Sequence, residues 1–128
     1  MRIDRDDITD VTIRQVERGS LRIGNEVITG PVALTADTII RDWPAIAVED
    51  LEPADLDTLL EWQPEVIVVG AGWRSVLPPQ RLVFAMARRG IGIEFMDTPA
   101  AARTFNILVA EGRRPAAILL LGKAGDAG

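Results

Sequence analysis

The chain has 128 residues, of which 48% are hydrophobic and 26% charged, and its net charge is −5. This composition is typical of a globular protein with one buried core, and the acidic balance argues against non-specific binding of nucleic acid, which needs a concentrated basic surface. The chain lacks Cys, His and Tyr, so zinc or iron sites built on thiolate or imidazole, Cys nucleophiles and Ser-His-Asp triads are excluded.

The charges are unevenly distributed along the chain. Residues 1–64 carry 6 basic and 14 acidic side chains, whereas residues 65–128 carry 8 basic and 5 acidic ones. The sequence therefore leaves open the possibility of a local anion-binding site in the second half of the chain. The first residues are polar and acidic, unlike a secretory signal, and no apolar run approaches the roughly 18 residues that span a bilayer. We expect a cytoplasmic protein without direct membrane insertion.

Short runs of alternating apolar and polar residues follow the N-terminus and predict an antiparallel meander. Gly24-Asn25 is a good hairpin turn because both residues tolerate positive φ. Gly30-Pro31 should interrupt or bulge the third strand, since Pro has no backbone N–H to donate to a neighbouring strand. Four strands are predicted, over residues 11–16, 21–23, 27–34 and 38–41.

An acidic helix is predicted over residues 53–62, after Trp43-Pro44 ends the run of strands. Leu56, Leu59 and Leu60 would share its apolar face. The acids of EDLEPADLD gather at its N-terminus, where the helix macrodipole favours them. Their spacing does not match a calcium loop, so we interpret them as a solvated face.

The second half of the chain predicts a β-α-β-α-β unit, with strands over residues 66–69, 93–96 and 116–121. The helix that follows Pro78-Pro79 should end near Arg89, with Gly90 as its stop. The second helix covers residues 98–112: Thr98 is a suitable N-cap, Pro99 suits the first helical position, and Gly112 ends the helix. This alternation is typical of a parallel sheet with right-handed crossovers.

Together these elements predict one α/β domain over residues 1–128. N-terminal antiparallel strands would join the C-terminal parallel unit in a three-layer arrangement, as one mixed sheet or as two abutting sheets. We expect the ordered core to cover about residues 10–121, with flexible tails at residues 1–9 and 122–128.

Two polar turns follow strands of the parallel unit and should lie at the same edge of the sheet, where open α/β sheets bind ligands. The helix N-terminus there offers unpaired N–H groups, and Arg103 adds a fork suited to carboxylate or phosphate. The candidate ligand or partner site consists of Gly70, Gly72, Trp73, Arg74, Asp97, Thr98, Arg103, Thr104 and Asn106.

Each candidate also has a structural interpretation, which we favour. Gly70-Ala71-Gly72 is a partial dinucleotide motif without its third glycine, and tight turning explains it as well. Asp97 suits a helix cap, although it also suits a general base or metal ligand. Arg103 would pair with Asp97, Glu94 or another acid, and Asn106 would satisfy buried backbone. We therefore assign no catalytic residue, cofactor or metal ligand.

The residues around this helix resemble a known family. They are Asp97-Thr98-Pro99-Ala100-Ala101, Arg103-Thr104, Asn106, Leu108 and Glu111-Gly112-Arg113. The set, together with the glycine loop after residues 66–69, resembles a small domain-of-unknown-function family that includes the mitochondrial respiratory complex I assembly factor and many short bacterial proteins. The resemblance spans about residues 10–121. It implies a three-layer α/β fold and a non-enzymatic role in assembly, with no established catalytic residue.

The chain departs from the family pattern at three positions near the two polar turns and the helix that begins there, which we call the polar corner. Phe105 stands where a tyrosine is usual, Ala102 where a cysteine is frequent, and Ala71 where a hydroxyl residue is common. These changes remove polar groups and favour recognition over catalysis. The sequence thus predicts a binding or assembly module, a monomer or weak dimer with a protein partner. The alternative is a small-molecule or anion-binding protein or enzyme that uses the polar corner.

Overall fold

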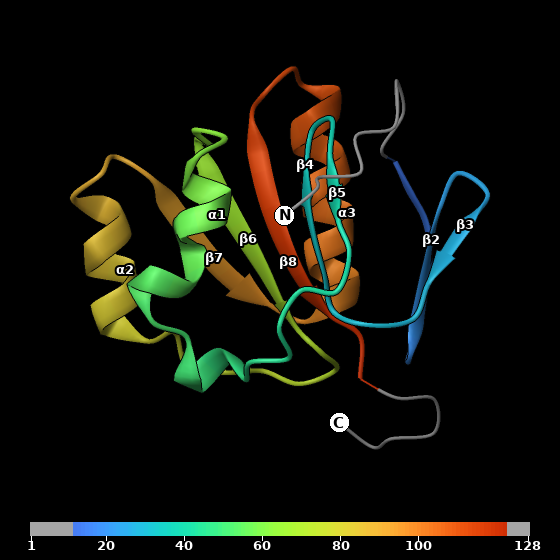
Figure 1. Cartoon of the computed structure of the whole chain (residues 1–128), viewed down its shortest axis with the longest axis horizontal. Helices are drawn as coiled ribbons and strands as arrows, with labels where there is room; N and C mark the ends of the chain where they lie inside the picture. The colour runs from blue at the N-terminus through green and yellow to red at the C-terminus, as the bar shows by residue number, and fades with distance from the viewer. Residues whose placement is uncertain (1–11, 123–128) are drawn as a thin grey trace.

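The computed structural model describes residues 12–122, and its centre is a five-stranded sheet in the order β5-β4-β8-β6-β7 (Figure 1). β6 pairs in parallel with β7 and β8, whereas β4 pairs antiparallel with β8 and with β5. The sheet is therefore mixed. Its strands are β4 (Val32–Thr35), β5 (Ile39–Ile40), β6 (Val66–Ala71), β7 (Gly92–Met96) and β8 (Pro115–Leu120).

The predicted β-α-β-α-β unit is confirmed. α2 (Gln80–Ala87) connects β6 to β7, and α3 (Thr98–Ala110) leads from β7 back across β6 to β8. Right-handed crossovers that run in opposite directions across a sheet place their helices on opposite faces, so α2 and α3 cover different faces (Figure 1). Gly90 and Gly112 follow the two helices with φ of 75° and 76°, as their predicted role as helix stops requires.

A second, three-stranded antiparallel sheet precedes the main one. It contains β1 (Ile13–Glu17), β2 (Ser20–Ile23) and β3 (Glu26–Ile28). The predicted interruption at Gly30-Pro31 is confirmed. It divides the strand expected over residues 27–34 into β3 and β4, which belong to different sheets rather than to one meander. Val11, the predicted tail at residues 1–9 and all but the first residue of the predicted tail at 122–128 lie outside the described residues.

The acidic segment is less regular than predicted. A 3₁₀ turn, η1 (Val48–Asp50), comes first, and a second, η2 (Pro53–Leu56), runs directly into one α-helical turn, α1 (Asp57–Leu60). A capping box between Glu52 and Asp55 starts η2. The predicted apolar face is confirmed, since Leu56 and Leu59 are fully buried and Leu60 is half-buried.

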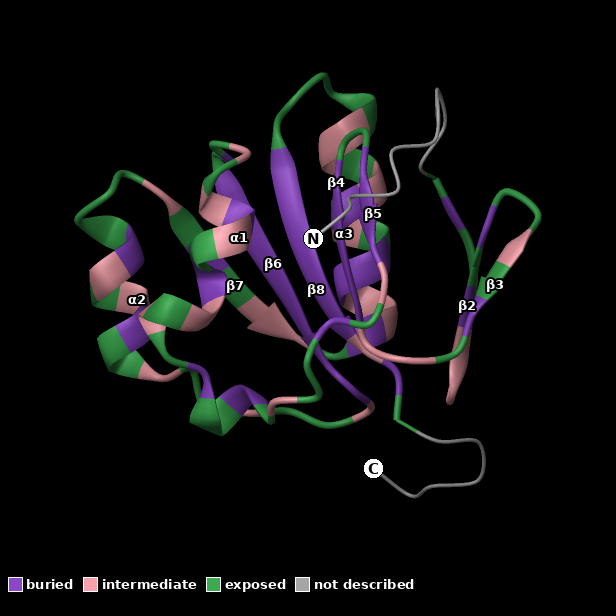
Figure 2. Ribbon diagram, viewed as in Figure 1, coloured by how far each residue is buried: buried purple, intermediate pink, exposed green. Residues whose placement is uncertain are grey.

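The main sheet separates two hydrophobic cores, which gives the predicted three layers. Val68 faces the core that holds Phe105 of α3 and the small sheet, whereas Ile67 and Val69 face the core beneath α1 and α2. Every residue of β6 is therefore buried, and β8 is buried over nearly all its length (Figure 2). This confirms the mixed α/β fold expected from the β-branched run in β6.

The small sheet is held to the rest of the molecule by polar contacts as well as by its apolar face. The Asn106 side chain on α3 accepts a hydrogen bond from the Ile13 N–H at 2.9 Å and donates one to the Ile13 carbonyl at 3.1 Å. The Arg41 guanidinium forms two hydrogen bonds with the Glu26 carboxylate on β3, at 2.6 and 2.5 Å. Arg41 accordingly lowers the pKa of Glu26 below its ordinary value.

Replacement of Asn106 tests how the small sheet is attached. Asn106→Ala leaves both backbone groups of Ile13 without this partner, so we expect the free energy of unfolding to fall by about 1–3 kcal/mol and the Ile13 amide to exchange faster with solvent. Urea unfolding and amide hydrogen exchange measure the two effects. The control is Ile107→Ala at the next position, which is 57% exposed; equal losses in the two variants would contradict the account.

Candidate functional site

The two polar turns meet at the carboxyl edge of the sheet, as predicted. β6 ends at Ala71 and β7 at Met96. Beyond them, the Gly72 N–H donates to the Thr98 hydroxyl at 2.9 Å, and the Thr98 N–H donates to the Gly72 carbonyl at 2.7 Å. The two turns are therefore bonded directly to each other.

The contact between these turns is closed. Thr98 has no exposed surface, and its hydroxyl also donates to the Leu120 carbonyl at 2.6 Å. A Cβ on Gly70 would lie 2.8 Å from the Thr98 hydroxyl oxygen and 2.9 Å from the Thr98 Cα, which is too close for any side chain. Gly72 has a φ of 86°. We call Gly70, Gly72, Thr98 and Leu120 the Thr98 seam; its glycines serve close packing and tight turning.

Asp97, rather than Thr98, is the N-cap of α3. Its carboxylate accepts a hydrogen bond from the Ala100 N–H at 2.8 Å. The prediction of Thr98 as the cap is wrong, because the Thr98 hydroxyl is held by the seam and Thr98 is already helical. Pro99 consequently occupies the second helical position. The alternative that Asp97 serves as a helix cap is confirmed.

Trp73 and Arg74 leave the seam toward the surface. The Trp73 ring is half-buried, and the Arg18 guanidinium lies 5.5 Å from its centroid, within cation–π range. Arg74 forms a two-bond pair with Glu49, at 2.7 and 2.8 Å. The hydrogen bonds from Arg74 lower the pKa of Glu49 to about 2. Both groups stay charged at neutral pH and neutralise each other.

The remaining candidates on α3 do not converge with Trp73 and Arg74. Arg103 is exposed, and within residues 12–122 it forms no ion pair with Asp97 or Glu94, so the predicted pairing is wrong for that region. The Thr104 hydroxyl contacts the Met96 sulfur at 3.5 Å. Asn106 satisfies the backbone of Ile13, which confirms its predicted structural role.

Two hollows flank the Thr98 seam. The first is a polar depression of about 510 Å³ lined by Trp73, Arg74, Ser75, Asp97 and Pro99. Its two charged side chains are already engaged, one with Glu49 and the other with the N-terminus of α3. An anion placed there would also meet the Asp97 carboxylate, which would repel it.

The second hollow, also of about 510 Å³, is predominantly apolar, and we call it the apolar groove. It is lined by Thr29, Gly30, Pro31, Ala45, Ile46, Ala47, Ala71, Gly72, Arg74, Leu120, Leu121 and Gly122. Arg74 is the one charged side chain among these lining residues, and Glu49 neutralises it. The volume is within the range of about 300–1,000 Å³ that is usual for ligand pockets.

Sequence reasoning missed most of the apolar groove. Gly72 and Arg74 are its only members among the predicted site residues. The others are Ala71 at the end of β6 and residues from the break at Gly30-Pro31, from the segment after Trp43-Pro44 and from the end of β8. The Trp43 N–H donates to the Pro31 carbonyl at 3.2 Å, which brings the two breaks together. The breaks were visible in the sequence, but this contact was not.

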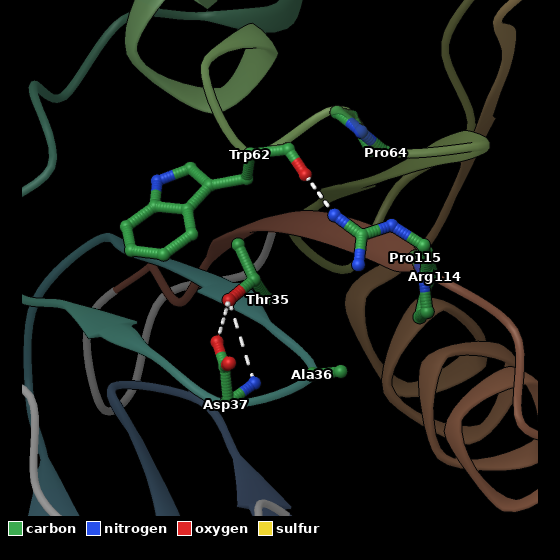
Figure 3. A pocket seen from close by; sticks show the side chains of 7 residues that line it. All are labelled: Thr35, Ala36, Asp37, Trp62, Pro64, Arg114 and Pro115. Atoms are coloured by element: carbon green, nitrogen blue, oxygen red, sulfur yellow. Dashed lines mark hydrogen bonds between the residues drawn. The ribbon is translucent and has the colours of Figure 1, made fainter.

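A third hollow lies at the opposite edge of the sheet, where β8 begins (Figure 3). There Arg114 donates to the Trp62 carbonyl, and the Thr35 hydroxyl donates to Asp37 at 3.2 Å. The hollow measures about 60 Å³, far below the size of a ligand pocket. Its polar groups stabilise the turns that line it.

Comparison with known proteins shows the family of this chain. The family model described as "Protein of unknown function (DUF498/DUF598)" matches residues 13–120. The chain belongs to this family. A crystal structure from Bordetella parapertussis has the same fold, with a TM-score of 0.81 and 32% identity over 91% of this chain and 99% of that chain. The family resemblance and the fold predicted from the sequence are thereby confirmed.

Two curated relatives differ in what their names say. The bovine "NADH dehydrogenase [ubiquinone] 1 alpha subcomplex assembly factor 3" is 38% identical over 112 residues, which are 86% of this chain and 60% of the relative. The "13 kDa major membrane protein" of Francisella tularensis is 30% identical over 91 residues, 70% of this chain and 74% of the relative. The chain thus spans about 60% of the bovine assembly factor's length.

Neither a membrane-crossing helix nor a metal-binding cluster appears between residues 12 and 122. The helices in this range are too short or too polar to cross a bilayer. In the same range, the acidic side chains do not form a group of three or more that could hold a metal ion.

The Arg74–Glu49 pair predicts a specific titration. Because the pKa of Glu49 is lowered to about 2 from 4.5, the pair stabilises the fold above pH 4.5, and this contribution is lost as the pH falls toward 2. We expect the Glu49 carboxyl, followed by NMR, to titrate near pH 2 and to return toward its ordinary pKa in Arg74→Gln. Arg81→Gln removes a different exposed arginine, which pairs with Glu52, and should leave the titration unchanged. An ordinary pKa of Glu49 in the unsubstituted protein would contradict the pairing.

Proposed function

We propose that this protein is a non-enzymatic binding module of the bacterial cytoplasm that assists assembly of a respiratory NADH dehydrogenase, and that a protein partner docks in the apolar groove. The observation that carries the proposal is the groove itself. It is an open, mainly apolar hollow at the carboxyl edge of the sheet, and the one charged side chain among its lining residues within 12–122, Arg74, is already paired.

The lining of the apolar groove suits side chains of a partner protein. Ala45, Ile46 and Ala47 offer apolar surface, and burial of such surface gains about 25 cal/mol per Å². Among the lining residues that the structure describes, Arg74 is the only one with a charged side chain, and an arginine is a poor general acid or base because it stays protonated. These features support recognition of an apolar segment rather than catalysis.

The relatives support the assembly role more than they support any particular partner. The bovine and human assembly factors share 38% identity with the chain, over 86% and 80% of its length. Since the chain spans about 60% of the bovine relative, we propose that the shared region supplies the docking surface.

A groove-blocking substitution tests the proposal. In the native host, the gene is deleted and replaced by the unsubstituted gene, by Ala45→Arg or by Ala110→Arg. Ala45 is exposed and lines the groove, whereas Ala110 is exposed at the end of α3 and serves as the matched control. Assembled NADH dehydrogenase is measured on native gels and by NADH oxidation in membranes, with the level of this protein followed by immunoblot.

We expect deletion to reduce the assembled enzyme several-fold, because a docking step is lost. The unsubstituted gene and Ala110→Arg should restore assembly, and Ala45→Arg should not, at equal protein level. Normal assembly in the deletion strain would show that the assembly role is wrong. Full restoration by Ala45→Arg would show that the partner docks elsewhere.

A further inference from the structure

The edge strands of the two sheets differ in how well they are shielded. At the edge of the small sheet, β1 has both backbone groups of Ile13 bound by Asn106. β3 has three residues and is tied to Arg41 through Glu26, and β5 has only two residues. Short strands and covered backbone are the usual protection against unwanted pairing. The fourth edge strand, β7, lacks these features.

β7 offers a regular backbone edge. Its five residues pair with Val66–Gly70 of β6 in unbroken register and contain no proline. The Gly92 N–H points toward β6, since it donates to the Glu65 carbonyl at 3.4 Å. Because the backbone groups of successive strand residues point to alternate sides, those of Ile93 and Phe95 point away from β6. These four groups are positioned to receive another strand.

Gly92 has no evident function in the fold of this chain. Its φ is not positive, and a Cβ added there would meet only the Val66 Cγ2, at an ordinary 3.8 Å. Glycine weakens a strand interior and often marks a place where another backbone approaches closely. Gly92 thus contrasts with Gly70, where the Thr98 seam leaves no room for a side chain.

Glu94 supplies charge at the same edge. It is exposed, and within residues 12–122 it takes part in no ion pair. It projects to the same face of the sheet as Met96, two residues on, whose sulfur contacts Thr104 of α3. On the other face, Ile93 and Phe95 belong to the hydrophobic core. On an added strand, the residue directly opposite Glu94 would pair best if it carried a positive charge. Its two neighbours, which face the same side as Ile93 and Phe95, would pair best if they were apolar.

We propose that β7 binds an extended segment of a partner protein as a sixth strand, and that this segment carries Lys or Arg opposite Glu94 between two apolar residues. A second copy of this chain fits less well. The β7 strand of a second copy contains no basic residue that could lie opposite Glu94, whereas a segment of a partner protein can supply one.

Site-specific crosslinking tests the proposal with the full chain in its native host. A photoreactive residue replaces Arg89, which is exposed in the turn before β7, so the edge of β7 itself is unchanged. Mass spectrometry identifies the crosslinked segment, which is then made as a peptide and bound to the purified unsubstituted protein. We expect one segment with an apolar–basic–apolar pattern, and slower hydrogen exchange at the Ile93 and Phe95 amides when the peptide is bound.

Charge reversal supplies the matched comparison. Glu94→Arg should weaken peptide binding roughly tenfold or more, since like charges directly opposite each other on adjacent strands are destabilising, whereas Glu61→Arg at an exposed glutamate elsewhere should not. A crosslink to a second copy of this chain, no crosslink, or equal affinity in the two variants would overturn the proposal. Ala45→Arg should leave this binding intact, so failure here is distinguishable from failure of the groove proposal.

Discussion

The hydroxyl of Thr98 is the contact on which the arrangement of the other elements depends. It accepts from Gly72 after β6 and donates to Leu120 at the end of β8, so the start of α3 is fixed against two strands at once. Gly70 allows this approach because it has no side chain. α3 in turn places Asn106 against Ile13, and the position of the small sheet therefore also depends on the seam.

The Thr98 seam also decides which surfaces are open for binding. Because it closes the space between the two polar turns, the carboxyl edge of the sheet has two separate hollows rather than one cleft. In the polar depression, Arg74 and Asp97 already have partners. In the apolar groove, the surface comes from small and aliphatic residues. Apolar recognition by the groove and strand pairing by β7 both suit a protein that binds other proteins.

Much of the fold was predictable because the decisive signals are local. The β-branched run in β6, Pro115 at the start of β8, and the glycines after α2 and α3 determine the parallel unit. The choice between Asp97 and Thr98 as the cap of α3 could not be made from the sequence. Both are good caps, and the Thr98 hydroxyl is taken up by the distant Gly72 N–H and Leu120 carbonyl. The groove was missed for the same reason: its residues come from four segments that no local pattern connects.

Comparison of Thr98→Val with Thr98→Ser tests most directly whether the hydrogen bonds of the Thr98 seam stabilise the fold. Valine keeps the shape but removes the hydroxyl, leaving the Gly72 N–H and the Leu120 carbonyl without this partner, whereas serine keeps the hydroxyl and loses one methyl group. We expect urea unfolding to show that Thr98→Val lowers the free energy of unfolding by about 1–3 kcal/mol and that Thr98→Ser lowers it by less. Equal stability of Thr98→Val and the unsubstituted protein would contradict the central role of the seam.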